Sequence, residues 1–222
     1  MSAHANRTPA EESFVSGFAA AEAALPSADW LKRKQAFAAF SEMGLPHRRI
    51  EAWKYTDLRN LMDGAYPAQI ETTLVDVEQV QSLAQQSIFS DISRSTAVFV
   101  DGRFRSELSS LPENGAIELL AISDAAENAP GWLSDTLGTV VPQQDDAVSA
   151  LNTAYLSDGA AIRVTGESKE PLELVFVHSD SQPRTISQRV LVVVEAGASC
   201  ELFETHVAPA DARYVSTVVT EV

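Results

Sequence analysis

The spacing of hydrophobic residues divides the chain into a first part with helical periodicity and a later part with strand periodicity. Near the N-terminus, Thr8 and Glu11 flank Pro9 in the pattern of a capping box, in which two side chains satisfy the free N–H groups of a helix start. Pro26 ends this segment. We therefore predict a helix over residues 9–25, and its hydrophobic stripe consists of Phe14, Phe18, Ala21 and Leu25.

The same periodicity predicts further helices downstream. A second helix should run from Ala28 to Met43 and end there, because Gly44 accepts the left-handed conformation and Leu45 can pack back. Thr56 is the expected N-cap of a short helix that ends near Gly64, and Asp76 is the expected N-cap of another. One side of the second helix should carry Trp30, Phe37 and Phe40 as core residues.

Strand patterns dominate the later part of the chain. Residues 96–104 have the chemistry of a β-hairpin, since Asp101 and Gly102 tolerate the positive φ of a tight turn. Residues 146–156 predict one more helix, with Ala147, Leu151 and Tyr155 on one face. Turn-forming residues then separate five predicted strands, which are residues 160–164, 172–178, 187–194, 199–207 and 214–222.

Two architectures fit these strands, and periodicity alone does not separate them. One is a sandwich or barrel built from hairpins, and the other is a β-solenoid of stacked coils. The sequence ends at Val222 within a β-run, so we expect either an edge strand or a fragment of a longer protein. Such an edge predicts a homo-oligomer formed through residues 214–222. We expect two domains, a helical one over residues 1–90 and a β-rich one over residues 91–222.

Composition and charge restrict the classes of partner. The 222 residues have a hydrophobic content of 45% and a formal net charge of -15, which disfavours nucleic acid as the general partner. No stretch of about 18 apolar residues is present, so the sequence predicts no membrane span. The single cysteine and the lack of a signal-peptide pattern indicate the cytoplasm. Seven basic residues nevertheless lie between Lys32 and Arg59, either on solvated helix faces or in a docking patch for an acidic partner.

Side chains that could carry chemistry are sparse. The sequence lacks the glycine-rich phosphate-binding, dinucleotide-binding, esterase and dithiol motifs, so we predict no catalytic site. Cys200, Glu204 and His206 share one side of a predicted strand, but Cys200 and Glu204 would lie roughly 13 Å apart along it, too far for one metal. His178 and His47 are expected to be structural or solvated. We therefore predict no metal or cofactor site in this chain.

One short segment has a distinctive sequence. Its residues Arg49, Glu51, Trp53, Lys54, Tyr55, Thr56 and Leu58 follow Gly44-Leu45-Pro46. Large aromatic rings among charged residues predict a loop fixed to the rest of the fold, with docking to a partner as the alternative. The order and spacing resemble the N-terminal signature of the SufB/SufD family, and the Trp-Lys-Tyr-Thr form is that of its SufD branch. Later segments agree, namely residues 99–103, 151–154, 158–159, 162–164, 170–172 and 195–198.

The resemblance implies a fold and a function. The implied fold is α+β and mostly β, with a small helical domain before a right-handed parallel β-helix that is truncated here on its C-terminal side. The implied function is that of a non-catalytic scaffold subunit of the SUF iron-sulfur cluster assembly complex, which pairs with SufB and the ATPase SufC. ATP and the cluster would be handled through these partners. The alternatives are a generic β-solenoid interaction module and a carbohydrate-active β-helix enzyme, for which the strands offer the carboxylates of Glu173, Glu201 and Glu204.

Overall fold

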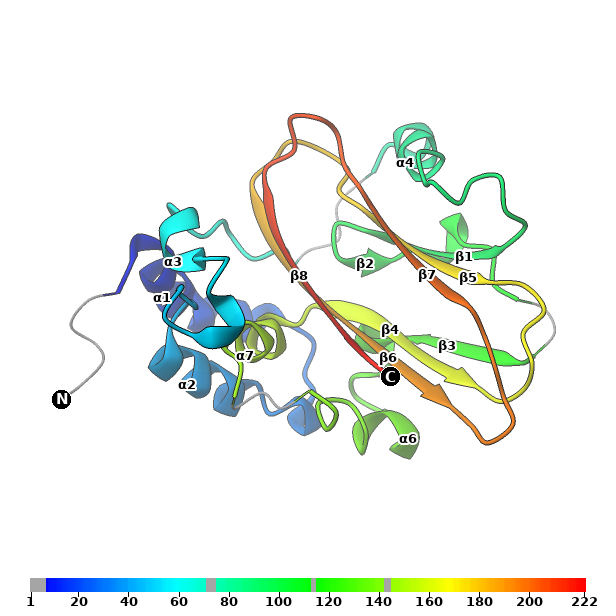
Figure 1. Cartoon of the computed structure of the whole chain (residues 1–222), viewed down its shortest axis with the longest axis horizontal. Helices are drawn as coiled ribbons and strands as arrows, with labels where there is room; N and C mark the ends of the chain where they lie inside the picture. Colours follow the sequence, from blue (N-terminus) through cyan, green and yellow to red (C-terminus); the bar gives the residue numbers. More distant parts are fainter. Residues whose placement is uncertain (1–6, 71–74, 113–114, 142–144) are drawn as a thin grey trace.

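A computed structural model describes residues 7–70, 75–112, 115–141 and 145–222. Figure 1 shows helices α1, α2, α3 and α7 gathered on one side of the molecule and most of the strands on the other. No helix within the described ranges is long and apolar enough to cross a membrane. The α-helices are α1 (Pro9–Ala24), α2 (Arg33–Met43), α3 (Leu58–Leu61), α4 (Val77–Ala84), α5 (Ile122–Ala125), α6 (Gly131–Ser134) and α7 (Ala147–Tyr155), with 3-10 turns η2 (Asp29–Leu31), η3 (Glu51–Trp53) and η4 (Ser106–Leu108).

Local capping rules place most helix ends correctly. The capping box before α1 is confirmed: the Thr8 hydroxyl accepts from the Glu11 N–H at 3.3 Å, and the Thr8 N–H donates to the Glu11 carboxylate at 2.7 Å. Gly44 ends α2 with a φ of 68°, and the adjacent Leu45 is buried in the core, both as expected. Asp76 caps α4 as predicted. These ends follow from interactions within a few residues, which explains why the sequence predicts them.

Two helix predictions are wrong. The helix expected over residues 28–43 is interrupted at Lys32, whose φ of 53° separates η2 from α2. As a result, Trp30 leaves the helical core and its indole N–H donates to the Ala126 carbonyl at 3.0 Å. The short helix α3 starts later than predicted, because Asp57 and not Thr56 caps it by accepting from the Asn60 N–H.

The strands form two mixed sheets of four strands each. Their orders are β2-β1-β5-β7 and β3-β4-β6-β8. Strands β1, β5 and β7 run parallel, as do β4, β6 and β8, while β2 and β3 pair antiparallel at one edge of each sheet. The bounds are β1 (Ser95–Val100), β2 (Arg103–Phe104), β3 (Ile117–Ala121), β4 (Asp158–Val164), β5 (Leu172–Val177), β6 (Arg184–Val194), β7 (Leu202–Val207) and β8 (Tyr214–Glu221).

This topology corrects the expected fold class. The right-handed parallel β-helix, or β-solenoid, is wrong, since no closed solenoid forms among the residues that the structure describes. The physical reason lies at the edges: the Asp101-Gly102 turn reverses the chain, so β2 returns antiparallel along β1. Strand β3 likewise pairs antiparallel with β4. The hairpin, helix α7 and the five later strands are confirmed as elements, whereas β3 was not predicted.

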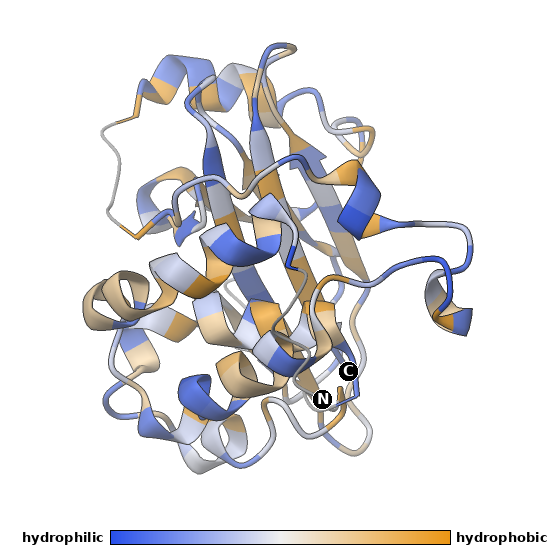
Figure 2. Ribbon diagram, turned by 90° about the vertical axis from the view of Figure 1, so that its left-hand side faces the viewer, coloured by the Kyte–Doolittle hydropathy of each residue, from blue (hydrophilic) through white to orange (hydrophobic). Residues whose placement is uncertain are grey.

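Hydrophobic side chains fill the space between the two sheets and cover their outer faces. The inner layer includes Phe99 and Phe176 from one sheet and Ile162 and Val190 from the other, all buried. Helix α4 covers the outer face of the β1–β5 pair, as Figure 1 shows. Figure 2 shows that hydrophobic stretches of the central strands are interrupted by strongly hydrophilic ones. Polar groups therefore lie inside this part of the molecule and require partners there.

Helix α7 links the two parts of the chain. Its predicted face of Ala147, Leu151 and Tyr155 packs against α1 and α2 in the helical core, as expected. The Tyr155 hydroxyl donates to the Phe14 carbonyl at 2.5 Å, and burial raises the pKa of Tyr155 to about 12. Helix α7 also contacts β6 and β8. The division into domains at residues 1–90 and 91–222 stays a prediction.

Candidate functional site

The segment with the distinctive sequence is a loop whose two ends meet. The Pro46 carbonyl accepts from the N–H of Leu58 at 3.0 Å, and the Arg48 guanidinium donates to the Asp57 carboxylate at 3.3 Å. Although partial burial opposes its charge, the bond from Arg48 holds the pKa of Asp57 below its ordinary value. We call residues 47–57 the motif loop. Compact loops with close ends are frequently functional.

Hydrogen bonds within the motif loop satisfy much of its backbone. The N–H of Ile50 donates to the His47 carbonyl at 2.9 Å, and the N–H of Trp53 donates to the Ile50 carbonyl at 2.8 Å. The N–H of Thr56 donates to the Trp53 carbonyl at 2.9 Å, which forms the next turn. These three bonds all join residues of the loop itself.

Most side chains of the motif loop face solvent. Tyr55 is 92% exposed, and Leu61 in the following helix α3 is 69% exposed. Trp53 and Leu58 are half-buried, and Leu58 packs against the helical core. Tyr55 therefore does not fix the loop to the fold, contrary to our preferred interpretation of the sequence. The remaining predicted site residues, Arg49, Glu51, Lys54 and Thr56, are exposed.

The structure separates the seven clustered basic residues into different environments. Arg33 is buried and donates to the Leu156 carbonyl at 2.6 Å, and burial lowers the pKa of Arg33 to about 10. It is therefore part of the core and not of a docking patch. Around the motif loop, Arg48, Arg49 and Arg59 line a hollow of about 450 Å3 together with His47.

The structure leaves Cys200, Glu204 and His206 without a common site. His206 and Glu204 make an exposed hydrogen bond of 2.7 Å, whereas Cys200 packs against the core between the sheets and burial raises its pKa. No group of three or more potential metal ligands occurs in the part of the chain that the structure describes. The carboxylates suggested for a carbohydrate-active enzyme do not converge either: Glu173 is buried and pairs with Arg94.

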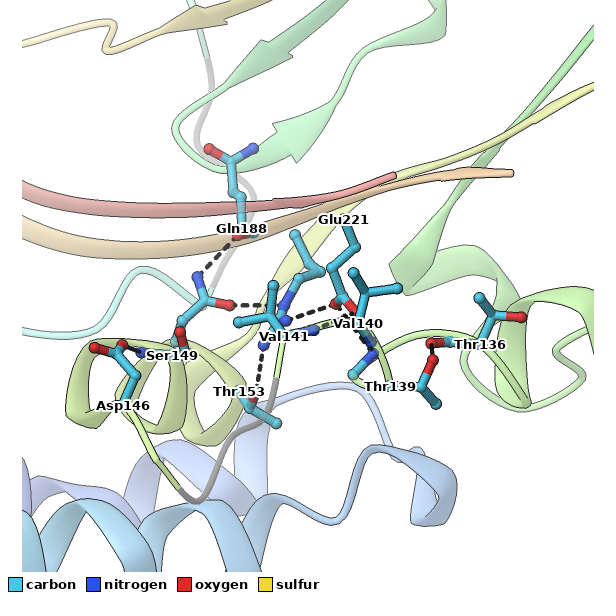
Figure 3. A network of polar contacts seen from close by, with 12 residues as sticks. Thr136, Thr139, Val140, Val141, Asp146, Ser149, Thr153, Gln188 and Glu221 are labelled. Carbon is cyan, nitrogen blue, oxygen red and sulfur yellow. Dashed lines mark hydrogen bonds and ion pairs between the residues drawn. The ribbon is translucent and has the colours of Figure 1, made fainter. Parts of the chain in front are cut away.

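A buried polar network joins α7, β6 and β8. Arg189 and Glu221 are each 0% exposed, and the Arg189 guanidinium donates to the Glu221 carboxylate at 2.6 Å. Figure 3 shows Glu221 next to Val140 and Val141, whose N–H groups donate to it at 3.2 and 3.4 Å. The N–H of Gly138 donates to both carboxylate oxygens at 3.0 and 2.9 Å. The carboxylate of Glu221 thus fixes a loop and a strand end at once.

Helix α7 completes this network through two polar side chains. The Asn152 carbonyl accepts from Arg189 Nε at 3.1 Å, while the Asn152 amide donates to the main-chain oxygens of Gln188 and Thr217 at 2.8 and 2.9 Å. Thr153 accepts from the other terminal nitrogen of Arg189. Sequence reasoning missed the role of Arg189 and Glu221. The available signal was one charged residue within each of two predicted strands, because a charged side chain that is fully buried is almost always paired.

Comparison with known proteins identifies the family. The family model of the SufBD protein N-terminal region matches residues 11–171, which is more than half of the chain. The chain belongs to the SufBD family. Similar curated proteins are the iron-sulfur cluster assembly SufBD family proteins slr0076 and slr0074 of Synechocystis. Identity with slr0076 is 29% over 203 residues, covering 86% of this chain and 44% of the relative; with slr0074 it is 30% over 155 residues, covering 67% and 30%.

The similarity extends to proteins of other organisms. The SufBD family protein ycf24 of Porphyra purpurea is 29% identical over 157 residues, covering 68% of this chain and 30% of the relative. The chloroplastic ABCI8 of Arabidopsis thaliana is 24% identical over 158 residues, covering 70% and 27%. The chain thus spans less than half the length of these SufBD relatives.

Several residues that carry the SufBD resemblance have structural roles in the strand part. Asp158 is buried and accepts the N–H groups of Phe104 and Ser123, each at 2.9 Å; burial raises the pKa of Asp158. At Gly159 a Cβ atom would lie 1.9 Å from the Arg189 carbonyl oxygen, a distance that no side chain tolerates. These residues, like Asn152 and Thr153, are explained by folding. The motif loop has no such explanation.

Proposed function

We propose that this SufBD family chain belongs to a non-catalytic scaffold component of SUF-type iron-sulfur cluster assembly. The match of the family model to residues 11–171 is the observation that carries the proposal. The names of the relatives support it, because each is called an iron-sulfur cluster assembly protein. In this role the cluster is cargo that the whole assembly builds and passes on.

The proposed partners follow from the SufD-like form of the motif loop. The sequence Trp53-Lys54-Tyr55-Thr56 favours a SufD-type subunit, which would pair with a SufB-like paralogue and a SufC-like ATPase. In that complex ATP is hydrolysed by the SufC-like subunit. We place the protein in the cytoplasm, although one relative is named as chloroplastic.

The use of polar side chains supports a scaffold over an enzyme. Three buried carboxylates are committed to structural ion pairs: Glu221 to Arg189, Glu173 to Arg94, and Asp101 to Arg184 at 2.9 Å. Catalysis requires groups that are positioned on a substrate and not already neutralised by each other. A stable frame for partner subunits is what such an interior provides.

Gene deletion with a complementation control tests the proposal. Deleting the gene that encodes this chain should lower the activity of an iron-sulfur enzyme such as aconitase during iron limitation, while the activity of malate dehydrogenase, which holds no cluster, stays unchanged. Re-expression of the full gene should restore aconitase. Co-purification of SufB-like and SufC-like proteins with the tagged full-length product tests the partners. Unchanged aconitase activity in the deletion strain, with no co-purified partner, would contradict the proposal.

A further inference from the structure

The motif loop and the adjoining helix α3 expose apolar surface that the fold does not use. Ile50 is 42% exposed, Tyr55 92% and Leu61 69%, and within the described ranges none of the three belongs to a hydrophobic core cluster. Single exposed hydrophobic residues are ordinary on protein surfaces. Three of them within twelve residues of sequence, two on the motif loop and one on helix α3, make this an unusual surface segment.

Positive charge accompanies this apolar surface. The side chain of Arg48 is 71% exposed, and its pair with Asp57 leaves most of the guanidinium open to solvent. Lys54 lies 5.2 Å from the centre of the Tyr55 ring and pairs with the exposed Glu51. The hollow beside them is lined by Arg48, Arg49, Arg59, His47 and Asp57. Arg59 is already paired with Glu11 at 3.3 Å, so the basic groups open to a partner are those of Arg48, Arg49 and Lys54. This local excess of positive charge contrasts with the net charge of -15 for the whole chain.

We propose that the motif loop is a docking surface for an acidic segment of a partner protein. Guanidinium groups bind carboxylates through two parallel hydrogen bonds, which suits the cluster around Arg48 and Arg49. Exposed tyrosine and arginine side chains are enriched where protein interfaces gain most of their affinity. The inference goes beyond the role in iron-sulfur assembly and does not depend on it.

Charge complementarity selects this occupant over two others. A nucleic acid is a long polyanion that would extend beyond the basic loop over the strongly negative remainder of the chain, which repels its phosphate groups, whereas a short acidic peptide segment can contact the loop alone. A second copy of the chain would bring its whole charge of -15 close to the equally negative remainder of the first copy, so a short acidic segment suits the loop better; the oligomer predicted through residues 214–222 does not involve this loop. In a partner segment with glutamates and a few apolar side chains, the glutamates can pair with the arginines and the apolar side chains can pack on Tyr55.

A peptide-binding experiment with charge-matched variants tests the docking surface. The probe is a fluorescein-labelled amphipathic peptide with a glutamate-rich face and a leucine-rich face, and fluorescence anisotropy reports its binding to the chain. The triple variant Arg48→Gln/Arg49→Gln/Lys54→Gln should weaken binding by about tenfold at low salt, or roughly 1.4 kcal/mol. High salt should also weaken binding of the peptide to the unmodified chain, because it screens the charges. Tyr55→Ser should weaken binding without removing its salt dependence.

The matched control removes the same charge from exposed lysines outside the loop. Lys32→Gln/Lys34→Gln/Lys169→Gln should bind the peptide as the unmodified chain does. Equal weakening in both triple variants would overturn the proposal, as would failure of the unmodified chain to bind the peptide. Loop-dependent binding of a single-stranded oligonucleotide in preference to the peptide would show a nucleic-acid site instead. Loop-dependent dimerisation in analytical ultracentrifugation, without peptide binding, would show that the occupant is a second copy.

Discussion

The motif loop and the Arg189–Glu221 network use polar residues in opposite ways. Both contain residues that carry the SufBD resemblance, yet Asn152 and Thr153 are buried with specific partners, whereas Tyr55 and Arg49 face solvent. In the network, the resemblance reflects what the strands need in order to fold. In the loop, the exposed side chains make no contacts in the described part of the core that would explain why they are part of the resemblance. The comparison therefore assigns the loop to binding and the network to stability.

Burial determines how costly a substitution is in each region. A charge at 0% exposure has lost its water, so removal of its partner leaves it uncompensated. An exposed charge keeps its water, and its ion pair contributes only about 0 to 1 kcal/mol.

Arg189→Met should lower the free energy of unfolding by about 3 to 5 kcal/mol, because it leaves Glu221 buried without its cation. Denaturant titration measures this difference. The control is Arg163→Met in the neighbouring strand β4, where the ion pair with Glu195 is partly exposed and the expected loss is at most about 1 kcal/mol. Equal losses of unfolding free energy in the two variants would contradict the prediction, because they would show that burial does not make the Arg189 pair more sensitive to substitution.

Gly159→Ala should destabilise the chain by about 3 kcal/mol, since the new Cβ forces the backbones of β4 and β6 apart. Thermal unfolding is a suitable measurement. Gly17→Ala in α1 is the matched control: its Cβ would lie 3.7 Å from the Tyr155 hydroxyl, an ordinary contact. That control should be neutral or stabilising by up to about 1 kcal/mol. A Gly159→Ala variant as stable as the parent would contradict the close approach of the two strands.

His178 should make the strand part sensitive to acid. The ring is buried and stacks on Tyr214 at 3.5 Å, and neither ring nitrogen has a hydrogen-bond partner within the described residues. Burial lowers the pKa of His178 to about 4, opposed by Asp101 and aided by His206 and Arg184. As the pH falls, His178 therefore becomes protonated near pH 6.5 in the unfolded state, but only near pH 4 in the folded state.

Stability should accordingly be complete above about pH 6.5 and fall as the pH drops toward 4, by at most about 3 kcal/mol from this residue. His178→Phe keeps the stack on Tyr214 but removes the titrating group, so its stability should change less over this range. Tyr214→Phe retains the histidine and should keep the parent slope. Identical pH profiles for His178→Phe and the parent would show that another group causes the acid sensitivity.

Local sequence rules predict the helices, turns and strands well, but they predict poorly which strands pair with one another. The capping box at Thr8, the turn at Asp101-Gly102 and the strand segments depend on neighbouring residues, and the structure confirms them. The pairing of β4 with β6 and the antiparallel edge strands depend on residues distant in sequence, and here the predicted β-solenoid is wrong. Arg189 and Glu221 are likewise 32 residues apart. Exposure of Tyr55 could not be predicted, because an aromatic residue suits both a core and an interface.

If the motif loop serves binding and not folding, removal of its exposed apolar side chains should leave stability unchanged. The test is the free energy of unfolding of a triple variant with Ile50→Ser and Tyr55→Ser in the loop and Leu61→Ser in the adjoining helix α3, measured by denaturant titration. Leu45→Ala, just before the loop in a buried position, is the positive control and should lose about 2 to 5 kcal/mol. We predict that the triple variant stays within about 0.5 kcal/mol of the parent. A loss of about 2 kcal/mol or more would contradict the claim and make the loop part of the folded core.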